Sequence, residues 1–368
     1  MGTSAGAEYT QLHLASRRKG ATLVKLSDCC RYAFGVCAAI AFLAGCGKSE
    51  TQIGLPPPLS QVVTHQAPSP AAACAAKPCI YVTNYTAGPS GYGSVTLYGL
   101  KANGNVSPIR TISGSNTGLV NPDGIALDSS HNIYVSNVYG ASLTVYSAGA
   151  KGNKAPIRTI SGSNTGLAYP NGIALDGSGN TYVANYGGND VLVFAAGANG
   201  NVAPIRTLSG SKTGLDAPVG VAFYKTHMYV VNYAGNSVTV YAESASGNQA
   251  PIKTISGSNT GLNNPQGLFV SAKTGDVYVA GFASSNVLVF AANAKGNVAP
   301  IRAISGSYTG LADDGGIVLD AKGKIYVANT AGNDVRVFDA KANGNVAPIR
   351  TISGSKTGVK TDYGITIY

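Results

Sequence analysis

Several residue types are scarce in this chain of 368 residues. Tryptophan is absent, methionine occurs twice, and Asp, Glu, Lys and Arg make up 11%, against roughly 25% in an average soluble protein. No apolar run reaches about 18 residues, which argues against a conventional membrane-spanning helix, and the absence of a Gly-X-Y period excludes collagen. Hydrophobic residues still reach 44% and tyrosine occurs 21 times, so the chain is not a disordered one. With 48 glycines, this composition favours short strands and tight turns.

Charge and histidine are also too sparse for several functions. The net charge is +10, and +7 remains once residues 1–45, which carry +3, are set aside. Without a Lys/Arg run or a nucleic-acid motif, this mild basic balance predicts no nucleic-acid partner. His131 and His227 fall in predicted turns and cannot by themselves form a three-histidine zinc site. No nucleophile elbow or phosphate-binding loop is present either.

The N-terminus has the features of an export signal. Five basic residues between positions 17 and 31 precede an apolar run, 32–43, that ends in Leu43-Ala44-Gly45-Cys46. This order resembles the signal peptide of bacterial lipoproteins, in which the Cys after a small residue receives a lipid. The resemblance implies removal of residues 1–45, lipidation of Cys46 and anchoring in the cell envelope, at the outer membrane or cell surface. An ordinary export signal followed by an incidental Cys is the alternative.

Residues 46–79 read as a tether that ends in a cysteine pair. The segment contains five prolines between positions 56 and 70 and few large apolar residues, which is typical of a semi-extended linker. Cys74 and Cys79 remain after the signal and the lipidation site are counted. In an exported protein this even pair predicts a disulfide, with two free thiols as the alternative. Zinc would need more ligands than the pair supplies.

From residue 80 onward the sequence consists of six copies of one repeat unit. The dipeptide Tyr-Val begins a short apolar run at intervals of 47 to 53 residues, at Tyr81, Tyr134, Tyr182, Tyr229, Tyr278 and Tyr326. Four candidate strands per unit are separated by Gly- and Asn-rich turns, as in 172–176, 181–185, 191–194 and 204–208. Four short strands in a repeat of this length predict a blade of a β-propeller.

The two ends of the repeat predict a closed ring. The first unit lacks an innermost strand, because Cys79 leads directly into residues 80–82, and the chain ends at 364–368 with a copy of that missing strand. We therefore predict an all-β fold, a six-bladed β-propeller over residues 80–368. Each blade has four antiparallel strands, and the C-terminal strand completes the first blade. We expect a monomer.

The repeated pattern resembles a known class of propellers. Gly-Ile-Ala-Leu-Asp, a Gly-rich turn, Tyr-Val-Ala-Asn and Val-x-Val-Phe recur across residues 80–368, and this is similar to the NHL-repeat class with six blades. The resemblance implies an architecture rather than an activity, because such propellers include enzymes, binding modules and scaffolds. One departure is an Asn where many NHL repeats carry Asp, at Asn84, Asn137, Asn185, Asn232 and Asn329. These amides could bind loop backbone, which we favour, or a hard cation.

One position in each unit varies while the rest barely changes. It is the middle residue of Pro-x-Gly before the inner strand, with Asp in place of Pro in the last two units, and is occupied by Asp123, Asn171, Val219, Gln266, Gly315 and Tyr363. By analogy with other propellers, these loops gather around the axis on one face. We therefore predict ligand contacts from Asp123, Asn171, Gln266, Asp314 and Tyr363. The alternative is that they are solvated loop residues.

A metal site is a second candidate for this face. A distant resemblance to gluconolactonase-like propellers, which coordinate a divalent ion with Glu, Asn and Asp on the axis, implies a divalent cation such as Ca²⁺. The candidate ligands are Asp123, Asp314 and Asp362, with Asn171 beside them. Glu243 is the only Glu after residue 50 and does not stand at an equivalent position. The resemblance to the gluconolactonases is therefore incomplete at the site itself.

A cation recurs in the outermost strand, at Arg110, Arg158, Arg206, Lys253, Arg302 and Arg350. It could form a belt for anionic polysaccharide or lipid, but protection of a sheet edge is the favoured interpretation.

Uniform blades, an anchor and no catalytic motif favour a binding module for a protein or carbohydrate ligand. A metal-dependent lactonase-like hydrolase is the alternative, and a purely structural surface protein is a third hypothesis. An enzymatic activity is less expected than binding.

Overall fold

The computed structural model describes residues 78–85 and 92–368, apart from the side chain of Asp362. All of them belong to one compact unit. The predicted signal peptide, the lipidation site Cys46, most of the tether and Cys74 lie outside the described residues. Within the described part, no helix is both long and apolar enough to cross a membrane.

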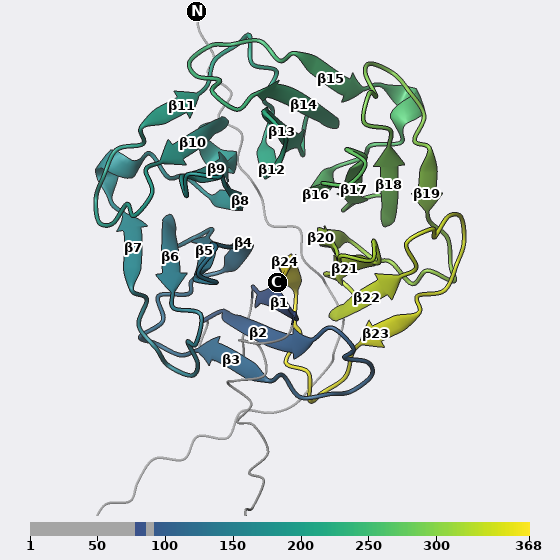
Figure 1. The fold of residues 1–368 in the computed structure, drawn as a ribbon, viewed down its shortest axis with the longest axis horizontal. Helices are drawn as coiled ribbons and strands as arrows, with labels where there is room; N and C mark the ends of the chain where they lie inside the picture. Colours follow the sequence, from purple (N-terminus) through teal and green to yellow (C-terminus); the bar gives the residue numbers. More distant parts are fainter. Residues whose placement is uncertain (1–77, 86–91) are drawn as a thin grey trace, which may run out of the picture. The chain divides into compact units, whose positions relative to one another are not determined.

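Six antiparallel sheets of four strands surround a central axis (Figure 1). From the inside outward, blade one consists of β24 (Asp362–Ile367), β1 (Cys79–Asn84), β2 (Ser94–Gly99) and β3 (Arg110–Ser113), and blade two of β4 (Pro122–Leu127), β5 (Ile133–Asn137), β6 (Ser142–Tyr146) and β7 (Arg158–Ser161). Blade three consists of β8 (Pro170–Leu175), β9 (Thr181–Asn185), β10 (Asp190–Phe194) and β11 (Arg206–Leu208), and blade four of β12 (Pro218–Tyr224), β13 (His227–Asn232), β14 (Ser237–Ala242) and β15 (Lys253–Ser256). Blade five consists of β16 (Pro265–Val270), β17 (Val277–Gly281), β18 (Asn286–Phe290) and β19 (Arg302–Ile304), and blade six of β20 (Asp314–Leu319), β21 (Ile325–Asn329), β22 (Asp334–Phe338) and β23 (Arg350–Ile352). Three short 3-10 turns lie in the loops: η1 (Ser163–Thr165), η2 (Tyr186–Gly188) and η3 (Ser258–Thr260).

The predicted ring closure is confirmed. The C-terminal strand β24 pairs antiparallel with β1, with Ile367 opposite Ile80 and Ile365 opposite Val82. The all-β fold with six blades of four antiparallel strands is thereby confirmed as well. The first strand begins at Cys79, one residue before the predicted start of the propeller. Because the first and last strands share one sheet, unfolding of the C-terminal strand exposes the inner edge of blade one.

The inner and outer strands differ slightly from their predicted ranges. In blade three the inner strand β8 starts at Pro170 rather than at 172, with an irregular register between Pro170 and Ile173. Proline is tolerated there because it is the first residue of an edge strand. The outer strand β11 begins at Arg206, since Pro204 cannot donate to the ladder. The Pro-x-Gly segment is therefore part of the inner strand itself, next to the axis.

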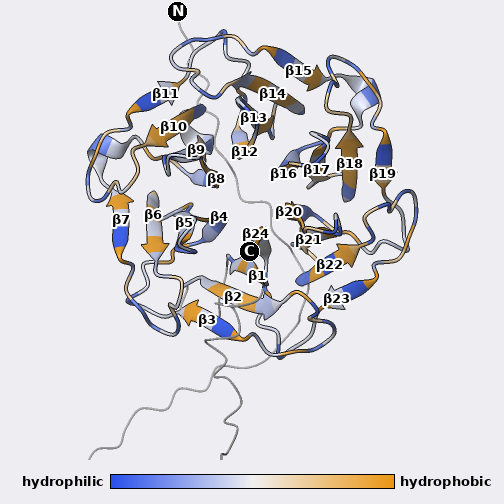
Figure 2. Cartoon of the chain, viewed as in Figure 1, coloured by the Kyte–Doolittle hydropathy of each residue, from blue (hydrophilic) through white to orange (hydrophobic). Residues whose placement is uncertain are grey.

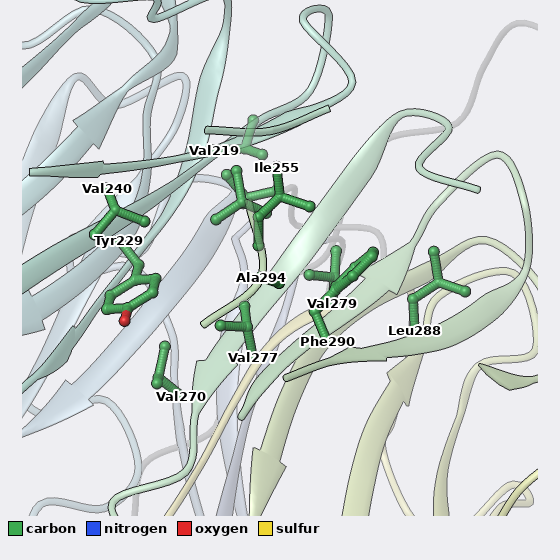
Figure 3. Packing of buried hydrophobic residues seen from close by; sticks show 12 residues of the cluster. Val219, Tyr229, Val240, Ile255, Val270, Val277, Val279, Leu288, Phe290 and Ala294 are labelled. Atoms are coloured by element: carbon green, nitrogen blue, oxygen red, sulfur yellow. The ribbon is translucent and has the colours of Figure 1, made fainter. Parts of the chain in front are cut away.

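The core lies between the faces of neighbouring blades. One cluster combines Val231 and Val240 of blade four with Val279 and Phe290 of blade five, and all four side chains are buried (Figure 3). Five further clusters join the other described neighbours in the same way. The two middle strands of each blade supply most of this apolar surface, and the outer strands carry hydrophilic residues (Figure 2). Each blade is thus stabilised by its neighbours, as expected for a closed repeat.

The repeated outer-strand cations link neighbouring blades. The guanidinium of Arg302 donates to the hydroxyl of Tyr278 (2.9 Å) in its own blade and to the carbonyl of Ala340 (2.9 Å) in the next. It also lies 5.7 Å from the centre of the Tyr278 ring. Arg158, Arg206, Lys253 and Arg350 lie over the equivalent tyrosines. These cations are engaged within the fold, so they do not form the exposed anion-binding belt considered from the sequence.

The repeated asparagines also have a structural role. The side-chain oxygen of each accepts a backbone N–H from the loop that precedes its blade's inner strand, as in the bond from Ala168 to Asn185 (2.7 Å). The same bond recurs at Asn84, Asn137, Asn232 and Asn329. All five side chains are completely buried. The interpretation that these amides bind loop backbone is confirmed.

Candidate functional site

The six inner strands surround the axis (Figure 1). A cavity of about 80 Å³ is lined by residues of these strands, where the Pro-x-Gly segments meet. We call it the axial cavity. Five of the six variable positions line it: Asp123, Val219, Gln266, Gly315 and Tyr363. The remaining lining is backbone of the repeated glycines and the aliphatic side chains that follow them. The sequence-predicted contacts Asp123, Gln266 and Tyr363 are therefore brought together.

The repeated glycine next to each variable position is required by close strand approach. A Cβ added to Gly364 would lie 2.0 Å from the carbonyl oxygen of Asp123, and one added to Gly124 would lie 2.5 Å from that of Asn171. Both distances are far below van der Waals contact. The six inner strands can converge at the axis only because this position lacks a side chain. The neighbouring residue is then the one whose side chain can vary.

Asp123 is the charged residue of the cavity. Its backbone carbonyl accepts a hydrogen bond from the hydroxyl of Thr83 (2.6 Å), which fixes the start of β4 against blade one. The side chain is only 7% exposed, and no described residue donates a hydrogen bond to its carboxylate. Burial raises the pKa of this carboxyl from 3.8 to about 7. The group therefore changes charge near neutral pH, which suits either a counter-ion or a proton acceptor.

Tyr363 lies beside Asp123 and carries a neutral phenol. Burial, reinforced by the nearby carboxyl of Asp123, raises the pKa of Tyr363 to about 12. Its ring is stacked on that of Phe282, with centroids 6.3 Å apart and an interplanar angle of 10°. The ring of Tyr85 lies on another side, at 5.1 Å. Burial also raises the pKa of Tyr85.

These rings belong to a continuous arc of aromatic side chains. Tyr85 contacts Tyr139 at 6.2 Å, and Tyr139 contacts Tyr169 at 5.6 Å. On the other side Phe282 contacts Tyr233 at 6.2 Å. The arc thus consists of Tyr169, Tyr139, Tyr85, Tyr363, Phe282 and Tyr233. We call it the aromatic arc, and its members come from blades one to five or the loops that lead into them.

The aromatic arc was not predicted from the sequence, although the repeats contain a signal for it. Tyr85 and Tyr233 directly follow the repeated Asn, and Phe282 follows the glycine that replaces it. An aromatic residue at that place in several units indicates a common face. Tyr139 and Tyr169 are 64% and 48% exposed, so the arc reaches solvent as well as Tyr363 at the cavity.

Other predicted site residues lie elsewhere. Asn171 is not part of the cavity lining, and its amide donates to the carbonyl of Tyr169 (3.2 Å). Asp314 is completely buried and does not line the cavity. The side chain of Asp362 is outside the described part. Among the described side chains, no group of three or more His, Cys, Asp or Glu could hold a metal ion. Because Asp362 is one of the candidate ligands, the predicted metal site stays a prediction.

The predicted disulfide is described at one end only. Cys79 takes part in a disulfide, and it is completely buried at the start of β1. Its predicted partner, Cys74, lies outside the described residues. The pairing of Cys74 with Cys79 therefore stays a prediction.

Comparison with known proteins supports the fold alone. No protein-family profile and no curated protein sequence matches the chain. Solved structures that resemble it include a protein of unknown function from Bacteroides caccae (12% identity, TM-score 0.58), which covers 79% of this chain and 98% of that one. Another is a periplasmic gluconolactonase from Pseudomonas aeruginosa (16% identity, TM-score 0.52), which covers 79% of this chain and 98% of that one. A third is a chain of a nidogen/laminin complex (14% identity, TM-score 0.52), which covers 79% of this chain and 97% of that one. These similarities agree with the propeller and with a distant resemblance to gluconolactonases.

Proposed function

We propose that this protein is a ligand-binding module of the cell envelope and that the axial cavity is its binding site. The proposal is carried by the position of Asp123. Its carboxyl is buried in a small cavity where every other described lining residue is uncharged. Burying an ionisable group without a partner destabilises a fold, so its presence at the one variable position points to a role in binding. The aromatic arc supplies contact surface beside it.

A plugging substitution tests the binding site. Gln266 lines the cavity and is partly exposed, so a tryptophan there should fill the mouth without disturbing the core. Gln249→Trp, on an exposed loop, is the matched control. We expect thermal stabilisation of the full chain by at least one of glucose, N-acetylglucosamine, gluconolactone, choline and a pentapeptide, and its loss in Gln266→Trp but not in Gln249→Trp. Equal stabilisation in all three proteins would place the ligand elsewhere.

The proposed location rests on the sequence of the N-terminus. The basic stretch, the apolar run and Cys46 support export, lipidation and attachment to a membrane, with 46–79 as the tether. Labelling with a fatty-acid analogue in a bacterial host should modify the wild-type chain and not Cys46→Ser. Labelling of both proteins would contradict an anchor on Cys46.

Hydrolysis is a second candidate because of the same carboxyl. A group whose pKa is about 7 suits a general base at neutral pH, and one structural neighbour is a gluconolactonase. Hydrolysis of gluconolactone by the full chain, measured with and without Ca²⁺, should then be abolished in Asp123→Asn. Absence of turnover under both conditions removes this candidate and leaves the binding module.

A further inference from the structure

The charge around the axial cavity has one sign. Asp123 is the only described lining residue with a formal charge, and no Lys, Arg or His is among them. Tyr363 lies within electrostatic reach of a second carboxylate, Asp313, which helps to raise its pKa. A ligand that enters the cavity therefore meets negative charge and no compensating cation from the lining. An anionic ligand is disfavoured and a cationic one is favoured.

The aromatic arc adds to this preference. The face of an aromatic ring carries partial negative charge and attracts cations, and such contacts are strongest when water is excluded. Tyr85 and Phe282 both contact Tyr363, at 5.1 and 6.3 Å between ring centres. The phenols of Tyr85 and Tyr363 stay neutral because burial raises the pKa of each. Tyr363 thus lines the cavity together with Asp123, and Tyr85 and Phe282 contact Tyr363 without lining the cavity themselves.

The size of the cavity suits a small cationic group. Its volume of about 80 Å³ holds several water molecules, which is room enough for an alkylammonium head group. The remainder of a larger ligand would lie on the exposed rings of Tyr139 and Tyr169.

We propose that the axial cavity binds a small organic cation, an amine or quaternary ammonium head group, with Asp123 as its counter-ion and Tyr363 as its aromatic wall, against which Tyr85 and Phe282 pack. This inference rests on the proposed function and names the ligand class for the same site. The carboxyl is more than nine-tenths buried and accepts no hydrogen bond from the described residues. A bound cation would satisfy it.

The proposal has a defined pH dependence. Because the pKa of Asp123 is about 7, the carboxyl is ionised at pH 8 and protonated at pH 5, so affinity for a cation should fall as the pH is lowered. The described groups that act on Asp123 are the phenols of Tyr85 and Tyr363, which remain neutral over this range. Three further carboxyl groups stand at the beginnings of neighbouring inner strands, Asp313 and Asp314 at β20 and Asp362 at β24, so each needs its own Asp→Asn control.

Calorimetric titration of the full chain tests the proposal. The probes are choline and 3,3-dimethylbutan-1-ol, its neutral isostere, each at pH 8 and pH 5. At pH 8 we expect choline to bind at least about tenfold more tightly than the isostere. At pH 5 the affinity for choline should be at least about tenfold lower than at pH 8. Nα-acetyl-lysine amide, titrated in parallel, distinguishes a peptide amine from a quaternary ammonium. Binding of either cation about tenfold more tightly than the neutral isostere supports the proposal.

Matched variants identify the groups responsible. Asp123→Asn should remove both the preference for charge and the pH dependence, whereas Asp216→Asn, on an exposed loop, should change neither. Tyr363→Phe keeps the ring and should retain the affinity for choline, while Tyr363→Leu removes the ring and should weaken choline binding about tenfold. Equal binding of choline and its isostere, or no binding of any cation, would overturn the inference. If a sugar or lactone then still bound and Gln266→Trp blocked it, the binding module would stand without the cation.

Discussion

Replacing Asp123 by asparagine should stabilise the protein at neutral and alkaline pH. The pKa of this carboxyl is raised by burial from 3.8 to about 7, so between these values the folded state holds a proton that the unfolded state has released. Stability therefore decreases as the pH rises from about 4 to about 7, and the loss is complete above the folded pKa. Asparagine has a similar shape and no charge, so it should not show this decrease.

The magnitude follows from the shift. A difference of roughly three pH units at about 1.4 kcal/mol per unit amounts to roughly 4 kcal/mol of unfolding free energy. We expect Asp123→Asn and the wild type to differ little at pH 4 and by up to about 4 kcal/mol at pH 8, with the variant more stable. Such a gain on removing a site residue is typical of a group retained for function.

Urea unfolding at pH 4, 6 and 8 measures this difference. Circular dichroism is a suitable signal because the chain contains no tryptophan. Asp216→Asn, at an exposed position, controls for the general loss of a carboxylate and should follow the wild type at every pH. If Asp123→Asn shows the same pH dependence as the wild type, the carboxyl is not desolvated in the folded state and the reasoning is refuted.

Three further predictions concern the fold. Asn185→Ala leaves the N–H of Ala168 and other buried polar groups without partners, so urea unfolding should show a loss of about 2–4 kcal/mol; a loss below 0.5 kcal/mol would contradict the structural role. Tyr146→Phe removes the bond to the Thr117 carbonyl (2.6 Å) and should destabilise the fold by about 1–2 kcal/mol in the same assay; no change in stability would contradict a role for this bond. Ending the chain at residue 361 removes β24 and exposes the edge of β1, so size-exclusion chromatography should show aggregation, whereas a folded monomer would argue against closure through β24.

The fold could be predicted because its determinants are local and repeated. Each unit carries its own strands and turns, and the missing first strand matches the extra last one, so closure was visible in the sequence. The cations of the outer strands were harder to interpret. Arg302 contacts a carbonyl 38 residues further on, in the next blade, and this contact exists only once neighbouring blades pack. From the sequence, protection of a sheet edge was the favoured interpretation of this residue and an exposed belt was the alternative.

The site could be predicted only in part. Variation at the Pro-x-Gly position correctly indicated that Asp123, Gln266 and Tyr363 face the axis. The same rule included Asn171, whose amide instead binds its own loop. The aromatic arc depends on ring closure, because Tyr85 and Tyr363 lie at opposite ends of the propeller sequence and contact each other only after β24 joins blade one. Burial of Asp123, and with it the raised pKa, likewise depends on the convergence of six inner strands.

The central claim is that a ligand occupies the axial cavity, and a crystal structure of the full chain grown with choline tests it most directly. We expect density for the ammonium head group between the carboxylate of Asp123 and the ring of Tyr363 at pH 8. The same density should be absent from crystals of Asp123→Asn. Choline bound at another surface, with the axial cavity filled only by water, would contradict the account.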